Sequence, residues 1–144
     1  MPIKCTYGDV GKLRDFPGPE GVVRGVASKL YDLVGVESVG DQVSVVDRFR
    51  IARFVNAVNE ELQVYGRVMS ALGKKYGEPS TVGGLSVFRI IPERQAEFDA
   101  EKSSFESEER DLLVNPLPVS AYERVPLTPR ELASLEKFVV LPPE

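Results

Sequence analysis

The side chains that most often perform nucleophilic catalysis are scarce in this sequence of 144 residues. It contains no histidine and one cysteine, Cys5. A serine or cysteine nucleophile is normally activated by an adjacent base, most often histidine, and zinc sites are built mainly from histidine and cysteine. Cys5 lies in a segment expected to form a strand, where a buried, unreactive thiol is the common case. We therefore predict no catalytic residue, no metal site and no cofactor site, so that the protein is not an enzyme.

The spacing of the glycines does not match that of a phosphate-binding loop. A phosphate loop places four residues between two glycines and follows them with lysine and a hydroxyl residue. The nearest stretch joins Gly66 to Gly73 across six residues, has Lys75 at the hydroxyl position, and falls within an expected helix. No G-x-G-x-x-G pattern follows an expected strand. The sequence thus predicts no nucleotide loop.

Acidic side chains gather between residues 93 and 111, which carry eight acids and three bases. They lack the glycine turn and the alternating spacing of a calcium loop, and we interpret most of them as a solvated helix face. The functional alternative is a docking surface for a basic partner, with electrostatic steering of association. The candidate partner-binding residues are Glu106, Glu108, Glu109 and Asp111.

Basic side chains dominate the segment before it. Residues 48–75 hold six basic and two acidic side chains, and Arg48, Arg50 and Arg53 form a second candidate partner-binding set. Alternatively, the basic and acidic helices pair with each other inside the chain, each exposed pair adding only tenths of a kcal/mol. No aromatic residues interleave with the arginines as single-strand binding requires. With a net charge of −4, we expect no direct contact with nucleic acid.

Length and composition indicate one ordinary domain covering residues 1–144. Hydrophobic residues make up 42% and charged residues 28%, which is close to the globular average. No apolar run of membrane-spanning length and no signal-peptide pattern occur, so we expect an intracellular protein without membrane contact. Asparagine, glutamine and methionine are few and proline is frequent; a thermophilic source and a GC-rich genome both account for this bias.

The periodicity of apolar residues predicts the order of elements. In chain order we expect a strand at 2–7, a helix at 10–16, a helix at 20–34, a connection at 35–46 with a possible short strand at 42–46, a helix at 47–76, a strand at 85–91, an acidic helix at 93–111, an extended segment at 112–127 and a helix from Thr128.

The helix at 47–76 carries the clearest signal. Its apolar residues step by four and three without interruption, at Ile51, Val55, Val58, Leu62, Tyr65, Met69, Leu72 and Tyr76. Phe49, Phe54 and Val64 are expected to widen this apolar face, and Asp47 is the candidate N-cap. The helix at 20–34 shows the same spacing, so the two should pack as an antiparallel hairpin.

The C-terminal helix has strong local start signals. Thr128 is a candidate N-cap, Pro129 occupies the first helical position, and Glu131 completes a capping box. Together these features predict an α+β fold in which a long helical hairpin packs beside a small, mainly antiparallel sheet, with a capped helix at the C-terminus.

The order of segments resembles that of a diffuse group of small uncharacterised proteins from bacteriophages and prophages. The resemblance rests on the turn at Gly8 and Asp9, the helix end LGKKYGE at residues 72–78, the acidic helix, the Leu-Leu-Val run at 112–114 and the run LTPRELASLEKF at 127–138. It covers most of the chain, and the group has no catalytic motif to transfer. In size, acidity and composition the chain is also similar in type to the small host RNA polymerase inhibitors of phages of thermophilic bacteria.

This resemblance implies two functions. The first is a non-enzymatic phage regulator in the host cytoplasm, which binds a host protein machine, most plausibly RNA polymerase or its sigma factor, and inhibits or redirects transcription. The alternative is a virion structural or assembly protein, such as a tail or neck component or an assembly chaperone, in which the apolar seam at 51–76 mediates oligomerisation.

Overall fold

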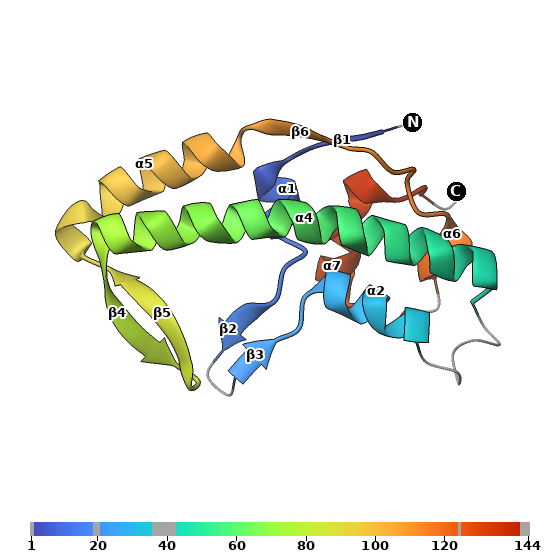
Figure 1. Ribbon diagram of the computed structural model, residues 1–144, viewed down its shortest axis with the longest axis horizontal. Helices are drawn as coiled ribbons and strands as arrows, with labels where there is room; N and C mark the ends of the chain where they lie inside the picture. The colour runs from blue at the N-terminus through green and yellow to red at the C-terminus, as the bar shows by residue number, and fades with distance from the viewer. Residues whose placement is uncertain (1, 19–20, 36–42, 124, 142–144) are drawn as a thin grey trace.

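One long helix, α4, crosses the whole molecule (Figure 1). The computed structural model describes residues 2–18, 21–35, 43–123 and 125–141. Its elements are β1 (Ile3–Thr6), α1 (Tyr7–Gly11), β2 (Phe16–Gly18), β3 (Gly21–Val23), α2 (Val26–Gly35), α4 (Val45–Tyr76), β4 (Gly77–Val82), β5 (Leu85–Ile90), η1 (Pro92–Arg94), α5 (Gln95–Glu106), β6 (Glu109–Leu112), α6 (Val119–Tyr122), α7 (Pro129–Ser134) and η2 (Glu136–Phe138).

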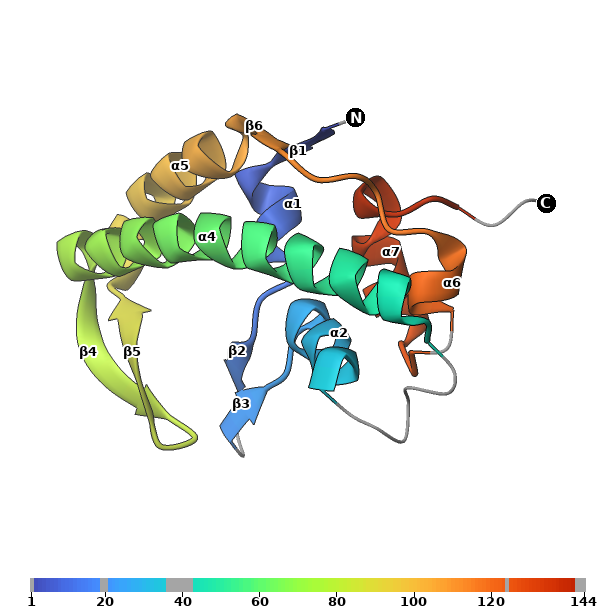
Figure 2. The same cartoon turned by 45° about the vertical axis from the view of Figure 1, so that its right-hand side comes forward.

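The elements divide between two sides of α4. Helix α5 and the β1–β6 pair lie on one side, whereas α2 and the hairpins β2–β3 and β4–β5 lie on the other, and the turned view agrees (Figures 1 and 2). This arrangement confirms the predicted α+β class. Among the described residues, no helix has the length and apolar character needed to cross a membrane.

The strands do not form one small sheet, as we expected. Within the described residues they form three separate two-stranded antiparallel sheets, β1–β6, β2–β3 and β4–β5. The predicted strand after Gly84 is confirmed as β5. Its partner β4 was not predicted, because Pro79 was interpreted only as a signal that ends the preceding helix. Proline is nevertheless tolerated on an edge strand, which is where Pro79 lies.

The predicted helix at 20–34 begins later than expected. Residues 21–23 pair with β2 instead, and α2 begins at Val26. Gly25 precedes it in a tight crossing, where a Cβ would clash with the backbone carbonyl of Arg14. The two helices of the hairpin therefore differ in length. Helix α2, with 10 residues, packs antiparallel against the N-terminal part of α4, which has 32 residues (Figure 1).

Two predicted helix starts are shifted by their caps. Helix α4 is capped by Ser44, whose Oγ accepts from the Asp47 amide at 3.1 Å, so Asp47 is the third helical residue and not the cap. Helix α1 is capped by Thr6 in a capping box with Asp9, so Gly8 and Asp9 lie within the helix and not in a turn before it. The predicted helix at 10–16 was wrong at both ends, since α1 spans Tyr7–Gly11 and Phe16 begins β2. Residues 36–42 lie outside the described residues, and the possible strand at 42–46 is contradicted because α4 begins at Val45.

The acidic segment is not one helix. It comprises η1 and α5, then changes direction into strand β6, which carries Glu109 and Asp111. A one-turn helix, α6, also interrupts the expected extended segment, because Pro118 is its N-cap and needs no amide hydrogen there. The capping box of Thr128 and Glu131 is confirmed at the start of α7.

The hydrophobic core lies around the N-terminal half of α4. Ile51, Phe54 and Val58 are fully buried there against α2 and the C-terminal segment, where Leu135 and Phe138 are buried as well. Farther along the predicted seam, Leu62, Met69 and Leu72 are only half-buried. The expectation that Phe49 and Val64 widen the buried face was wrong, since they are 66% and 37% exposed.

Candidate functional site

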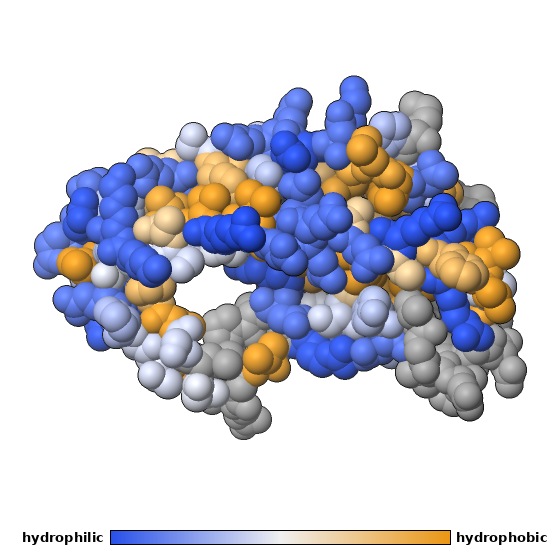
Figure 3. All heavy atoms as spheres, in the orientation of Figure 1, coloured by the Kyte–Doolittle hydropathy of each residue, from blue (hydrophilic) through white to orange (hydrophobic). Residues whose placement is uncertain are grey.

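Two of the predicted arginines line a groove at the N-terminal end of α4. Arg50 and Arg53 face the segment that follows β6 across a cavity of about 400 Å³, whose other lining residues are Pro2, Leu113, Val114, Asn115 and Pro116. Leu113 is 85% exposed and Phe49 is 66% exposed. Figure 3 shows apolar and strongly hydrophilic side chains side by side over this end of α4. We call Phe49, Arg50, Arg53 and Leu113 the arginine face.

A buried carboxylate fixes Arg50 within the arginine face. Asp47 is only 5% exposed. Its Oδ1 accepts from Nη1 of Arg50 at 3.0 Å, and its Oδ2 accepts from the Ser120 hydroxyl at 2.7 Å. Both carboxylate oxygens are thus satisfied, which holds one guanidinium in place beside Arg53 before any partner arrives. Such preorganisation reduces the entropy cost of binding.

Arg48 does not belong to this face, in contrast to the sequence prediction. Its Nε donates to the carbonyl of Val43 at 3.4 Å, and its side chain is half-buried. On a helix, residues two apart do not share a face. The three predicted arginines therefore separate into the Arg50–Arg53 pair and a side chain that supports the helix start.

The predicted acidic residues are also divided by the structure. Most carboxylates of residues 93–111 face water as expected, but Glu106 is half-buried and accepts a hydrogen bond from the Tyr65 hydroxyl at 2.8 Å. Burial and this contact raise the pKa of Tyr65 to about 12. The Tyr65 ring also meets Phe105, which stacks on Tyr7 at 4.4 Å between ring centroids. Glu106 therefore anchors α5 to α4.

The basic helix and the acidic segment pair inside the chain at two places. Lys75 meets Glu101 at 3.0 Å, and Arg110 meets Glu61 at 3.2 Å. The Lys75–Glu101 pair realises the intramolecular alternative at one place, whereas the Arg110–Glu61 pair joins a base of the acidic segment to an acid of the basic helix. The exposed carboxylates that remain from the predicted set are Glu108, Glu109 and Asp111.

Comparison with known proteins does not identify a function for these surfaces. No protein-family model, curated protein or solved structure matches the chain. The choice among the candidate surfaces therefore depends on geometry and chemistry.

A second cavity, larger than the groove beside Arg50 and Arg53, was not predicted from the sequence. It has a volume of about 730 Å³ and lies between the turn after α1, the start of α2 and helix α7. We call it the basic cleft, because its lining includes five cations and one carboxylate: Lys12, Arg14, Arg24, Lys29, Arg130 and Glu131. These residues come from three separate segments, and no spacing in the sequence relates one segment to another. Only the folded chain brings them together.

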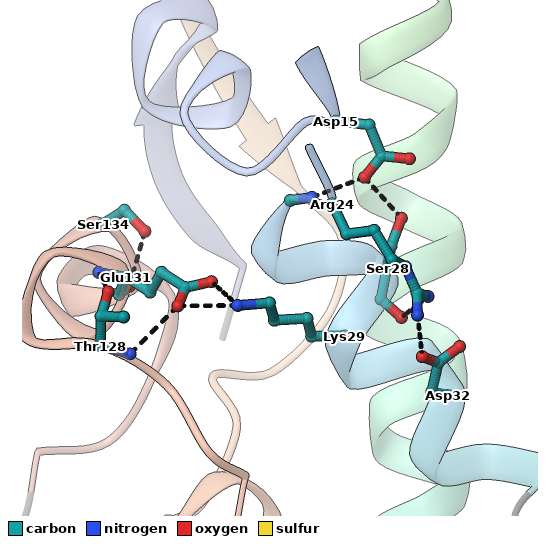
Figure 4. Close-up of polar contacts among 9 residues, drawn as sticks. Asp15, Arg24, Ser28, Lys29, Asp32, Thr128, Glu131 and Ser134 are labelled. Carbon is teal, nitrogen blue, oxygen red and sulfur yellow. Dashed lines mark hydrogen bonds and ion pairs between the residues drawn. The ribbon is translucent and has the colours of Figure 1, made fainter. Parts of the chain in front are cut away.

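An ion pair crosses the basic cleft. Lys29 of α2 reaches both carboxylate oxygens of Glu131 on α7, at 2.7 and 2.9 Å (Figure 4). The hydrogen bond from Lys29 holds the pKa of Glu131 below its usual value. Glu131 also accepts from the Thr128 amide at 3.0 Å. One carboxylate therefore caps α7 and ties it to α2.

The single thiol lies away from these surfaces. Cys5 is 5% exposed, and burial raises its pKa to about 11. At neutral pH the thiol therefore stays protonated, the unreactive form. Among the described residues, no group of three or more Cys, Asp and Glu side chains is placed to hold a metal ion.

Proposed function

We propose that this protein acts without catalysis, by docking its arginine face on an acidic surface of a partner protein. In the phage setting that the resemblance implies, the partner is the host RNA polymerase or its sigma factor, and docking in the host cytoplasm inhibits or redirects transcription. The observation that carries the proposal is the groove in which Asp47 holds Arg50 next to Arg53 and the exposed Leu113.

The composition of the arginine face suits a protein partner. Protein interfaces are enriched in arginine and aromatic residues, and their strongest contacts combine such anchors with apolar neighbours. Phe49 and Arg53 are four residues apart on α4, so they share one helix face. An acidic protein surface with apolar positions complements this arrangement.

The assembly alternative lacks a comparable observation. It requires a free apolar seam on the long helix. Between Ile51 and Val58 the seam is buried against this chain's own elements. Symmetric self-association in analytical ultracentrifugation would support that alternative and oppose the regulatory proposal.

The test measures binding to immobilised RNA polymerase core and holoenzyme from a thermophilic bacterium by biolayer interferometry. The test variant combines Arg53→Glu with Leu113→Ala, since both side chains are exposed. The matched control combines Arg67→Glu with Leu132→Ala. Both of these side chains are exposed and lie outside the arginine face. We expect the test variant to lose about tenfold or more in affinity and the control to bind as the wild type does.

Charge dependence provides the second part of the test. Wild-type association should slow as salt rises to about 0.15 M, where the screening length is about 8 Å. Reversal of Glu108 and Glu109 to lysine should leave binding intact. If that reversal abolishes binding and the arginine-face variant does not, the interface is the acidic segment. If neither polymerase form binds, the polymerase is not the partner.

A further inference from the structure

The basic cleft has the volume of a small-molecule site. Its volume of about 730 Å³ falls within the range of ligand pockets, roughly 300–1,000 Å³. The side chains of Val26 and Ala133 are among the lining residues and provide apolar contacts. A free phosphate ion would fill only part of this space, so the cleft suits a ligand with an apolar body as well as charge.

The cations of the cleft fall into two groups. Three have partners within the chain: Arg14 donates to the carbonyl of Gly11 and lies over the Tyr65 ring, Arg24 pairs with Asp32, and Lys29 pairs with Glu131. In the described part of the chain, the side chains of Lys12 and Arg130 form no hydrogen bond or ion pair. These two cations are available to an anion.

The carboxylates near the cleft are already engaged. Asp15 accepts from the Gly25 amide at 2.6 Å and from the Ser28 hydroxyl at 2.8 Å, which fixes the start of α2 (Figure 4). Asp32 is held by Arg24, and Glu131 is held by Lys29. The cleft therefore retains positive charge in a protein whose net charge is −4.

We infer that the basic cleft binds a nucleotide-sized organic phosphate, with Lys12 and Arg130 holding phosphate oxygens and Val26 and Ala133 contacting its apolar body. Arginine forms paired hydrogen bonds to phosphate, and lysine acts as a compact charge beside it. The ligand would contact α1, α2 and α7 together. This site is separate from the arginine face, and it remains testable if the proposed function fails.

The experiment titrates ADP, pyrophosphate and inorganic phosphate into the full chain by isothermal titration calorimetry. The test variant carries Lys12→Ala and Arg130→Ala. The charge-matched control carries Lys4→Ala and Arg89→Ala, an exposed lysine and an exposed arginine outside the cleft. We expect ADP to bind the wild type more tightly than inorganic phosphate, the test variant to lose about tenfold, and the control to bind unchanged.

A third variant should change affinity in the opposite direction. Glu131→Gln removes the one carboxylate among the described lining residues and keeps an amide oxygen for the capping box. It should tighten ADP binding, because the repulsion between Glu131 and the phosphates is lost. Thermal unfolding of each variant confirms that the fold is retained.

Several results would overturn the inference. One is an absence of ADP binding by the wild type at millimolar concentration, and another is equal affinity in the wild type and the Lys12→Ala, Arg130→Ala variant. If inorganic phosphate binds as tightly as ADP, the organic body is not recognised. If a single-stranded oligonucleotide binds more tightly than ADP, the cleft is a nucleic-acid site instead.

Discussion

The two ends of α4 share one apolar repeat and are packed in different ways. In residues 45–58, Ile51, Phe54 and Val55 are each no more than 1% exposed and belong to the main core. In residues 65–76 the buried positions are Tyr65, Gly73 and Tyr76, and the facing helix α5 has no buried residue among those described. An unbroken heptad pattern therefore predicts a helix and its inward face, but not how deeply each turn is buried.

The second half of α4 is held by aromatic rings and cations. Tyr76 meets the ring of Phe98 edge-on at 6.5 Å between centroids, and the guanidinium of Arg94 lies 4.5 Å from the Tyr76 centroid. Arg94 also donates to the carbonyl of Lys75 at 2.9 Å. Such contacts each contribute about 0.5–1.5 kcal/mol beyond burial. This half is therefore expected to open before the main core does.

The largest contrast should come from truncating one side chain in the core and one at its edge. Phe54→Ala should lower the free energy of unfolding by about 3–5 kcal/mol, because it removes a fully buried ring that meets Phe138. Leu62→Ala should cost only about 1–2 kcal/mol, since Leu62 is half-buried. Urea denaturation of both variants measures the two values. Equal losses would mean that the core continues past Val58.

Alanine substitutions at two glycines in the second half of α4 should change the stability of the protein in opposite directions. A Cβ at Gly73 would lie 2.6 Å from the Phe88 ring, whereas a Cβ at Gly66 would meet nothing within 4 Å. Gly73→Ala should therefore destabilise the protein by about 1–3 kcal/mol through overpacking. Gly66→Ala should stabilise it by about 0.5–1 kcal/mol, because alanine favours the helix. Stabilisation by both substitutions would show that β5 does not pack closely on α4.

The smallest effect concerns the hydroxyl of Tyr65. Tyr65→Phe removes the hydrogen bond to Glu106 and should cost about 1 kcal/mol near neutral pH. The folded state raises the pKa of Tyr65 to about 12 from the ordinary value of about 10. The stability from this group is therefore complete below pH 10 and is lost as the pH rises from about 10 to about 12.

The corresponding measurement compares wild type and Tyr65→Phe by urea denaturation at about pH 8 and about pH 11. The difference in stability between the two proteins should be smaller at the higher pH. Absorbance of the phenolate, followed in both proteins, identifies the titration of Tyr65. A difference that stays constant with pH would mean that Tyr65 is not protected by α5.

Local signals explain what the sequence could predict. The capping box at Thr128 and the strand after Gly84 depend on residues a few positions apart, and both predictions are confirmed. The β2–β3 hairpin was missed because Val23 continues the helical spacing of α2, and only pairing with β2 turns it into a strand residue.

The candidate surfaces show the same limit. Arg50 and Arg53 were predicted from their local charge, but their groove depends on Leu113, which is brought in by the pairing of β6 with β1. The basic cleft depends on contacts between Lys29 and Glu131, 102 residues apart. Composition and periodicity contain no information on such distances.

The pairing of β1 with β6 has a consequence for how the chain acquires its fold during synthesis. Thr6 pairs with Glu109, so among the described residues β1 has no partner strand until roughly 100 further residues have been made. At about 5–20 residues per second, a ribosome needs roughly 5–20 s to cover that distance. The N-terminal strand, with its apolar Ile3 and Cys5, is open to chaperones or neighbouring nascent chains throughout that interval.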